Sequence, residues 1–444
     1  MAMDISYRNL LRIALPVCLG AFVQFILVFT DNFFLGKLGM NEMNGAAMVG
    51  LVYLTLAIIG VGLGGGTQIL VARRTGEKNF ERGGRTLANA FYLSLIIAVI
   101  LFVLLYFVCP FFFNSWMKSQ EIRGIMARFL DIRAWGVFFF VPAAVLNGFF
   151  VGISRPKIIA VSTGAAAIVN VLLCWLLVFG RAGFPQMGVE GAATATLISE
   201  FIGLVIILAY TFRSKFSAIY SIPHAFSTAS FKDSPALLRI SGPMMLQLLL
   251  SLAIWTIFFV FVEKLGEKQM QASHIIRSMY LLALISTMGF SQTTRTVVST
   301  LMAENRLGDI KPALVRLAVL NFAGIVLLVH GLLLYPAAVA ELFTKDPETI
   351  GYTVKCMAVV FPAMLISSVS SILLNTVEGS GNTLPGFLVE LGTSVFYFTF
   401  AWWVTVVHPM PVHFAWMADW VYFGCIGLFA GLYLKFSNWR HTRV

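Results

Sequence analysis

The sequence predicts an all-α polytopic membrane protein with twelve transmembrane helices in two pseudo-symmetric six-helix lobes. The first observation is composition: 59% of the 444 residues are hydrophobic and only 11% are charged, whereas a soluble domain carries about 25% charged residues. The second is a series of apolar runs, each near the roughly 20 residues that a helix needs to cross a bilayer. The third is an internal repeat that divides these runs into two equal sets.

Each predicted span is an apolar run, in some cases interrupted by Gly or Pro. In order, the runs lie near 12–35, 46–72, 88–113, 130–152, 158–180, 188–212, 239–262, 272–301, 314–342, 353–377, 385–407 and 412–434. The first run is too long for the apolar part of a cleavable signal peptide, so we expect it to stay as a membrane helix. Glycines in 60–66 are expected to allow close helix approach.

Basic residues predict the orientation of these helices. With the N-terminus inside, the inner loops hold about twice as many Lys and Arg residues as the outer loops, the asymmetry found in membrane proteins. The densest inner cluster consists of Arg73, Arg74, Lys78, Arg82 and Arg85, whereas Lys118 and Arg133 count among the outer residues. We therefore expect a bacterial-type cytoplasmic membrane, both termini in the cytoplasm, and a net charge of +11 that reflects topology rather than nucleic-acid binding.

The internal repeat has an offset of 227 residues. LLRIALPV at 10–17 returns as LLRISGPM at 237–244, and LGKLG at 35–39 returns as VEKLG at 262–266. Because each half holds six helices, both halves have the same orientation in the membrane, an arrangement used by transporters.

The repeat also predicts the domain organisation. The expected N-lobe is 1–215, followed by a cytoplasmic linker at 216–234 and a C-lobe at 235–444.

Residues 22–39 form an apolar segment with a single acid, Asp31. A carboxylate inside a membrane segment costs several kcal/mol unless it finds water, a partner or a proton, so Asp31 is a functional-site hypothesis by default. The alternative is that the helix ends early and Asp31 lies among the headgroups; the apolar residues 33–35 after it favour the membrane position.

Three further polar residues interrupt apolar helices of the first half: Asn170, Thr196 and Glu200. A rise of 1.5 Å per residue places Asn170 and Thr196 at similar depth, Asp31 nearer the outer surface and Glu200 about 6 Å deeper. Ala192, Thr196 and Glu200 follow at intervals of four and share one helix face. We expect one pocket; alternatively, Asn170 and Thr196 bond backbone between helices, and Glu200 pairs with a donor in its own lobe.

This set suits a monovalent cation or a proton. A carboxylate, an amide oxygen, a hydroxyl and a backbone carbonyl are hard oxygen ligands; a proton would instead be carried by Asp31. The five cysteines show no metal-ligand spacing, and an odd number gives no disulfide framework. No cofactor is expected.

The layout resembles the multidrug and toxic compound extrusion (MATE) family. The resemblance rests on Pro16 with DNFFLGKLG at 31–39, the IRAWG word that opens 132–152, Asn170, and GVEGAATATLISE at 188–200. The second and fourth are most similar to the DinF branch. The resemblance implies two six-helix lobes around a central cavity, export of drug-like compounds for inward protons or sodium ions, and an ion site at Asp31, Asn170 and Thr196.

The chain departs from the family pattern at two positions. Relatives with the fuller site often have an acid where this chain has Cys174, so proton coupling is favoured over sodium and Glu200 is the candidate for the missing charge. Some relatives place a coupling Glu where this chain has Ser251. Cavity candidates with less support are Gln24, Ser251, Glu390 and Asp419, while Glu378 is expected to be solvated.

The function that the resemblance implies is a secondary antiporter that exports amphipathic, cationic drug-like compounds for inward protons, or sodium ions. The alternative is a flippase for a lipid-linked saccharide or a related large amphipathic substrate, which would need several basic residues in the cavity; only Arg277 and Arg295 lie within a predicted span. No HExxH, GxSxG or Walker motif indicates an enzyme or ATPase. The expected partners are amphipathic small molecules and the lipid bilayer, and the expected state is a monomer.

Overall fold

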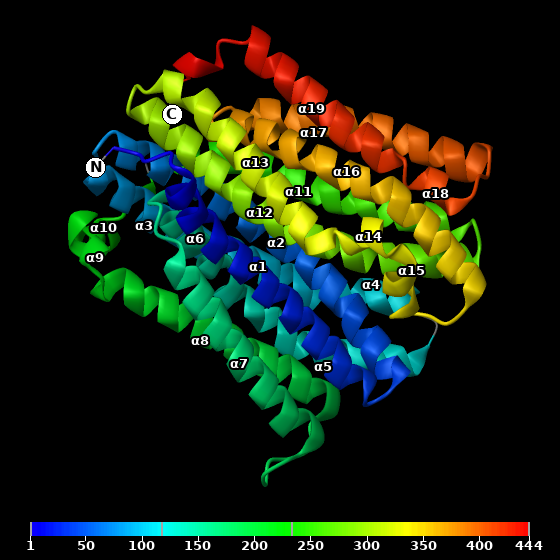
Figure 1. The fold of residues 1–444 in the computed structure, drawn as a ribbon. Helices are drawn as coiled ribbons and strands as arrows, with labels where there is room; N and C mark the ends of the chain where they lie inside the picture. Colours follow the sequence, from blue (N-terminus) through cyan, green and yellow to red (C-terminus); the bar gives the residue numbers. More distant parts are fainter. Residues whose placement is uncertain (1, 117–118, 232–233, 443–444) are drawn as a thin grey trace. The chain divides into compact units, whose positions relative to one another are not determined.

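The computed structural model describes residues 2–116, 119–231 and 234–442, and within these ranges the chain forms helices and turns without a strand (Figure 1). The all-α fold predicted from composition is therefore confirmed. Eleven helical segments of the described chain are long and apolar enough to cross a membrane. The remaining predicted span corresponds to α12 (Glu267–Ala303), which has the length but is more polar.

The first half contains ten helices and two short irregular turns. They are α1 (Tyr7–Gly36), α2 (Met40–Gly76), α3 (Phe80–Val103) with the π-helical turn η1 (Leu104–Val108), α4 (Cys109–Trp116), α5 (Gln120–Arg133), the 3-10 turn η2 (Ala134–Gly136), α6 (Val137–Gly152), α7 (Lys157–Phe179), α8 (Gly188–Arg213), α9 (Lys215–Ile219) and α10 (Ile222–Ser227). Asn79 begins α3 by accepting a hydrogen bond from the backbone N–H of Arg82, which satisfies one of the free donors at a helix start.

The second half again begins with two long helices. It contains α11 (Ser234–Glu263), α12, η4 (Leu307–Asp309), α13 (Ile310–Val329), α14 (Gly331–Leu334), α15 (Pro336–Glu341), α16 (Pro347–Gly379), α17 (Thr383–Trp402), η5 (Trp403–Val407), α18 (Val412–Ala415), α19 (Ala418–Phe436) and η6 (Trp439–His441). The predicted span at 314–342 is too long: the membrane-length helix ends at Val329, and Pro336 opens a separate short helix.

Helix lengths reproduce the sequence repeat. α1 and α11 each have 30 residues and an internal proline, Pro16 and Pro243. α2 and α12 each have 37 residues. Proline removes a backbone hydrogen bond inside a helix. The lead helices of the two halves, α1 and α11, therefore each lack one such bond at equivalent positions.

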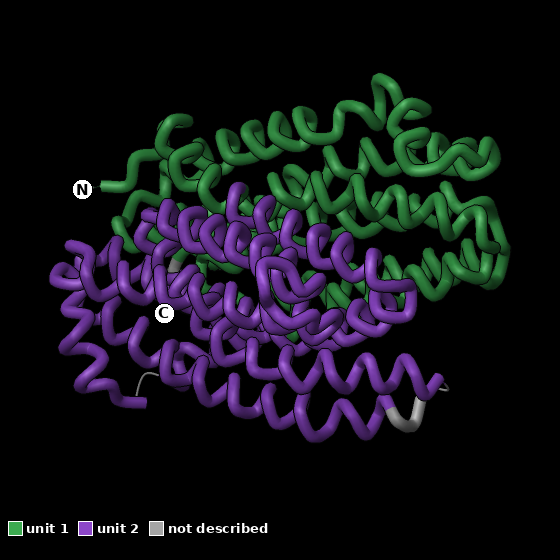
Figure 2. Tube along the Cα trace, turned by 90° about the horizontal axis from the view of Figure 1, so that it is seen from below, with its two compact units in different colours: residues 1–18, 246–444 green, residues 19–245 purple. Residues whose placement is uncertain are grey.

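Contacts divide the chain into two compact units, coloured in Figure 2: Met1–Cys18 with Leu246–Val444, and Leu19–Met245. Both boundaries fall inside a helix, α1 and α11 respectively. Cys18 and Met245 are separated by the repeat offset, so the two lead helices are divided at equivalent positions. The predicted lobes 1–215 and 235–444 follow the chain order rather than this division and stay a prediction; residues 232–233 of the linker lie outside the described residues.

In the unit Leu19–Met245, α2 and α6 approach backbone to backbone. A Cβ on Gly64 would lie 2.4 Å from the carbonyl oxygen of Ala144, and a Cβ on Gly148 would lie 2.1 Å from that of Gly64. Only glycine fits such an approach, as expected for the glycines after residue 60. α7 and α8 lie side by side in the same unit.

In the other unit, the first residues of the chain are fixed to the connection between α12 and α13. The backbone N–H of Met3 donates to Glu304 Oε1 at 2.9 Å, and Arg306 donates to the Met3 carbonyl at 2.7 Å. Arg316 donates to the carbonyl of Ile5. The N-terminal segment therefore lies at the same end of this unit as residues 304–309.

Candidate ion-coupling site

Asp31 lies in the last two turns of α1, inside a membrane-length helix that ends at Gly36. Its Oδ2 accepts a hydrogen bond from Thr196 Oγ1 on α8 at 3.2 Å. Asn170 on α7 donates through Nδ2 to the same Thr196 oxygen, also at 3.2 Å. The structure thus brings together Asp31, Asn170 and Thr196 from three helices.

Thr196 is the centre of this network because its hydroxyl faces two acceptors. Besides Asp31, the carbonyl oxygen of Ala192 lies 3.0 Å from Thr196 Oγ1, one turn back on α8. A hydroxyl has one proton to donate and two lone pairs to accept with. It therefore donates to Asp31 when that carboxylate is ionised. When Asp31 carries a proton, Asp31 donates to Thr196 and Thr196 donates to Ala192, so both states are fully bonded.

Cys174 completes the set, one turn after Asn170 on α7. Its Sγ lies 3.6 Å from Asp31 Oδ1 and 3.9 Å from Asn170 Oδ1. The thiol is fully buried. A thiol is a weak donor and a soft ligand, so it can bond to Asp31 but is a poor replacement for a carboxylate around a hard cation.

Glu200 is engaged elsewhere. Arg133, the last residue of α5, binds it with two parallel hydrogen bonds, Nη1 to Oε2 at 2.8 Å and Nη2 to Oε1 at 2.6 Å. The same guanidinium lies over the ring of Tyr53, 3.6 Å from its centroid. The alternative of a donor in the same lobe therefore describes Glu200, and counting Arg133 as an outer-loop residue was wrong.

Gly136 makes room for this ion pair. A Cβ there would lie 2.0 Å from Arg133 Nη1 and 2.7 Å from Glu200 Oε2. The IRAWG word thus supplies both the cation and, three residues later, the space that its guanidinium occupies. The Arg and the Gly of this word, three residues apart, are the sequence signal that indicates the ion pair. From the sequence alone, Arg133 is interpreted only as a basic residue of an outer loop.

Of the two acids, Asp31 and Glu200, that interrupt apolar helices of the first half, only Glu200 forms an ion pair among the described residues. Arg133 neutralises Glu200, which leaves Asp31 without an ion-pair partner among the described residues. One proton or one monovalent cation would balance it. A cation would find the oxygens of Asp31, Asn170 and Thr196. In the described part of the chain, no three His, Cys, Asp or Glu side chains gather as a metal site.

A second polar set lies in the second half, around Glu390 on α17. Ser251 on α11 donates to Glu390 Oε1 at 2.7 Å, and the hydroxyl of Tyr422 on α19 donates to the same oxygen. Glu390 is buried and has no described cation beside it. Ser251, where some relatives are expected to carry an acid, is therefore paired with an acid from another helix.

The remaining candidates differ from one another. Asp419 is buried in the first turn of α19, and its Oδ2 has no hydrogen-bond partner among the described residues. The partial positive charge at a helix start stabilises a carboxylate, so the start of α19 partly offsets the cost of burying the Asp419 charge. Gln24 is exposed on α1 and makes no described side-chain bond with the site.

The expectation that Glu378 is solvated was wrong. It is 3% exposed, accepts from Gln247 Nε2 at 2.9 Å and pairs with Arg295 at 3.3 Å. Because Arg295 is committed to this pair, it is not a free cation for a substrate phosphate.

Outside the membrane-length helices, Asp346 does not act as a pH sensor. Hydrogen bonds from Lys268 and Thr349 lower the pKa of Asp346 to about 2. A group with a lowered pKa changes charge only as the pH falls toward that value. Asp346 therefore stays ionised over the pH range of ordinary transport.

The fold and the site define a class of protein: a helical membrane transporter built from two repeats, with an unbalanced carboxylate among oxygen donors inside the first. The chain belongs to the MATE family, because the MatE family profile matches residues 16–176 and again residues 243–403. The two matches are offset by the same 227 residues as the repeat. The chain is accordingly a transporter and not an enzyme.

Relatives and solved structures agree with this assignment. A "Probable multidrug resistance protein NorM" of Rhizobium meliloti is 21% identical over 99% of this chain and 93% of its own length, and one of Thermotoga maritima is 23% identical over 86% and 82%. An outward-facing multidrug resistance MATE transporter matches with a TM-score of 0.88 at 18% identity, covering 97% of this chain and 96% of its own. The eukaryotic MATE transporter AtDTX14 matches with a TM-score of 0.83 at 17% identity, covering 98% and 96%. The likeness to the DinF branch stays a prediction.

Proposed function

We propose that this chain is a secondary antiporter that exports amphipathic, cationic drug-like compounds in exchange for inward protons, with Asp31 as the proton carrier. The observation that carries the proposal is that Asp31 has hydrogen-bond partners for both protonation states but makes no ion pair within the described part of the chain. The names of the NorM relatives, which describe multidrug resistance proteins, support the substrate class.

Protons are favoured over sodium ions because of the ligands that surround Asp31. Sodium would need several hard oxygens, and Cys174 stands where a second carboxylate would strengthen such a site. Coupling follows from reciprocal linkage: if proton binding at Asp31 lowers drug affinity, drug binding lowers proton affinity by the same factor. Asn170 and Thr196 position Asp31. When Asp31 is protonated, the Ala192 carbonyl accepts the hydrogen bond that Thr196 otherwise donates to Asp31.

Proteoliposomes with separate gradients test this proposal. We expect the purified chain to drive export when only a pH gradient is imposed, and to be inactive when only a sodium gradient is imposed at equal pH. The measurement is transport of a fluorescent organic cation across the proteoliposome membrane. Export with the sodium gradient alone would contradict the proton assignment.

Cys174→Asp gives a matched comparison in the same assay. It introduces a second carboxylate at the position whose sulfur now lies 3.6 Å from Asp31 Oδ1, so we expect it to add a response to sodium. The change Cys356→Ser, at a buried cysteine in the other half, serves as the control for altered packing.

We also propose that both termini and the linker 216–234 lie in the cytoplasm. A cysteine introduced at the exposed Ala229 is expected to react with a membrane-impermeant maleimide only after the cells are opened. The parent chain, with its five native cysteines, gives the background. Labelling of Ala229→Cys in intact cells would place the linker outside and reverse the topology.

The flippase alternative gains no support. It needs free basic side chains for a pyrophosphate, and Arg295 is paired with Glu378. Arg277 lies over the ring of Phe259, 5.3 Å from its centroid, and one arginine is a weak basis for such a substrate.

A further inference from the structure

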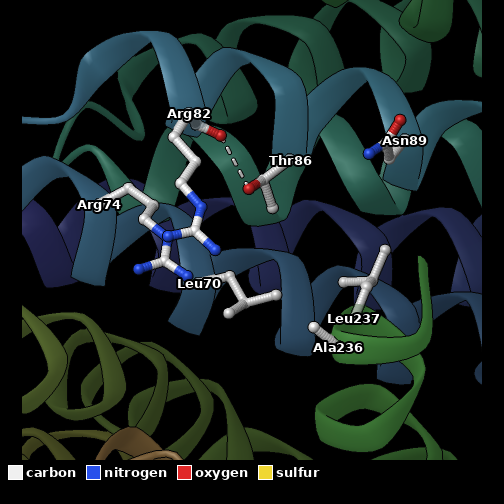
Figure 3. Close-up of a pocket in the computed structure, with 7 residues that line it drawn as sticks. All are labelled: Leu70, Arg74, Arg82, Thr86, Asn89, Ala236 and Leu237. Atoms are coloured by element: carbon white, nitrogen blue, oxygen red, sulfur yellow. Dashed lines mark hydrogen bonds between the residues drawn. The ribbon is translucent and has the colours of Figure 1, made fainter. Parts of the chain in front are cut away.

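A small basic pocket lies in the unit Leu19–Met245, formed by α2, α3 and the first turn of α11 (Figure 3). Its lining residues are Leu70, Arg74, Arg82, Thr86, Asn89, Ala236 and Leu237. Its enclosed part is small, about 20 Å³, and the rest of the space is open to the surroundings. None of the residues around Asp31 lines it, so it is separate from the proposed transport chemistry.

The charge of the pocket is positive. Arg74 and Arg82 both line it, and Figure 3 shows their guanidinium groups extending toward the same region. No acidic residue is among the lining residues. Arg74 is buried and pairs with Glu77 at 3.0 Å, whereas Arg82 is exposed and has no ion-pair partner among the described residues. One guanidinium is thus left without a balancing charge.

A buried polar side chain also faces this space. Asn89 is 4% exposed, and its amide makes no hydrogen bond with any described residue. Its amide atoms are not fully enclosed, so they are open to a partner in this space. Thr86, beside it, is occupied, because its hydroxyl donates to the Arg82 carbonyl at 2.9 Å. Asn89 is therefore placed to bond a small polar ligand.

The start of α11 adds donors at the opposite wall. Ala236 and Leu237 belong to the first turn of this 30-residue helix. The first backbone N–H groups of a helix lack partners within it; because Pro235 has no N–H, those of Ser234 and Ala236 remain here. The hydroxyl of Ser234 is buried without a partner among the described residues. Helix starts carry a partial positive charge and bind phosphate-type anions.

We propose that this pocket binds a phosphate group, presented either by an anionic lipid headgroup or by free phosphate. Arg82 and Arg74 supply charge, Asn89 donates its amide, and the first turn of α11 donates backbone N–H groups. The bound anion joins the Arg-rich turn after α2 to the beginning of α11, whose later residues, from Leu246, belong to the other unit. Occupancy is expected to stabilise the protein and to make its transport rate depend on the anion. This proposal does not rest on the antiport proposal.

Thermal unfolding of the purified full chain in detergent tests the site with two probes. Inorganic phosphate is titrated against chloride at equal ionic strength, and phosphatidylglycerol is titrated against phosphatidylcholine. We expect Tm to rise with at least one of the two anions. Arg82→Gln and Asn89→Leu should each require roughly tenfold more of it for the same rise, the effect of losing one charge-assisted or buried hydrogen bond.

Arg85→Gln is the matched control, because it removes the same charge one turn along α3 at a residue that is exposed, paired with Glu81 and outside the pocket. It should titrate like the parent. A rise with phosphate and with phosphatidylglycerol identifies a site open to water, and a rise with phosphatidylglycerol alone identifies a headgroup site. If Arg82→Gln and Arg85→Gln behave alike, or if neither anion raises Tm, the pocket is not an anion site.

Discussion

Asp31→Asn is expected to abolish gradient-driven export while leaving a folded, inserted protein. Asparagine keeps the size of the side chain and still accepts a hydrogen bond from Thr196, but it does not take up or release a proton. Without a coupled proton, the pH gradient does no work on the substrate. Export in proteoliposomes should fall to the level of protein-free vesicles, and substrate binding should no longer vary with pH.

The control for Asp31→Asn is Asp131→Asn, the same change at an exposed acid on α5. It should export like the parent. Asn170→Ala and Thr196→Ala should give partial losses, because each removes one bond from the network and keeps the carboxylate. Export by Asp31→Asn at the parent rate under a measured gradient would show that another residue carries the proton.

The largest effect on stability is expected from breaking the ion pair of Arg133 and Glu200. Both side chains are mostly enclosed, with exposed fractions of 11% and 20%. Arg133→Met leaves the Glu200 carboxylate with no cation in a low-dielectric site, and an uncompensated buried charge costs about 3–5 kcal/mol. Arg133→Met and Glu200→Gln are therefore each expected to lower Tm strongly in detergent.

The double change Arg133→Met with Glu200→Met separates charge from shape. Replacing a whole buried pair by apolar residues of similar volume is often neutral, so the double variant should regain most of the lost Tm. Arg85→Met is the matched control, since its partner Glu81 and Arg85 itself are both 54% exposed and such surface pairs contribute at most about 1 kcal/mol. A double variant less stable than either single variant would show that the residues contribute by packing alone.

The sequence alone determined the fold class, most of the spans, the repeat and the polar residues of the first half. The bilayer explains this success, because a spanning helix must be apolar over a nearly fixed length, so its limits are readable from composition. Depth follows from the constant rise per residue. That is why Asn170 and Thr196, predicted to lie at similar depth, are hydrogen-bonded in the structure, where Thr196 also bonds to Asp31.

Only the tertiary structure decided which polar side chains pair. Arg133 and Glu200 are 67 residues apart, and their pairing depends on how α5 and α8 are rotated about their axes. The burial of Glu378 beside Arg295 and Gln247 likewise depends on the packing of three helices. So does the bond of Glu390 with Ser251 and Tyr422. Rotation is set by the summed packing of many apolar side chains, which no local pattern encodes. The sequence therefore determined which helices carry the polar residues, and the folded structure determined which of these side chains are buried and what each one faces.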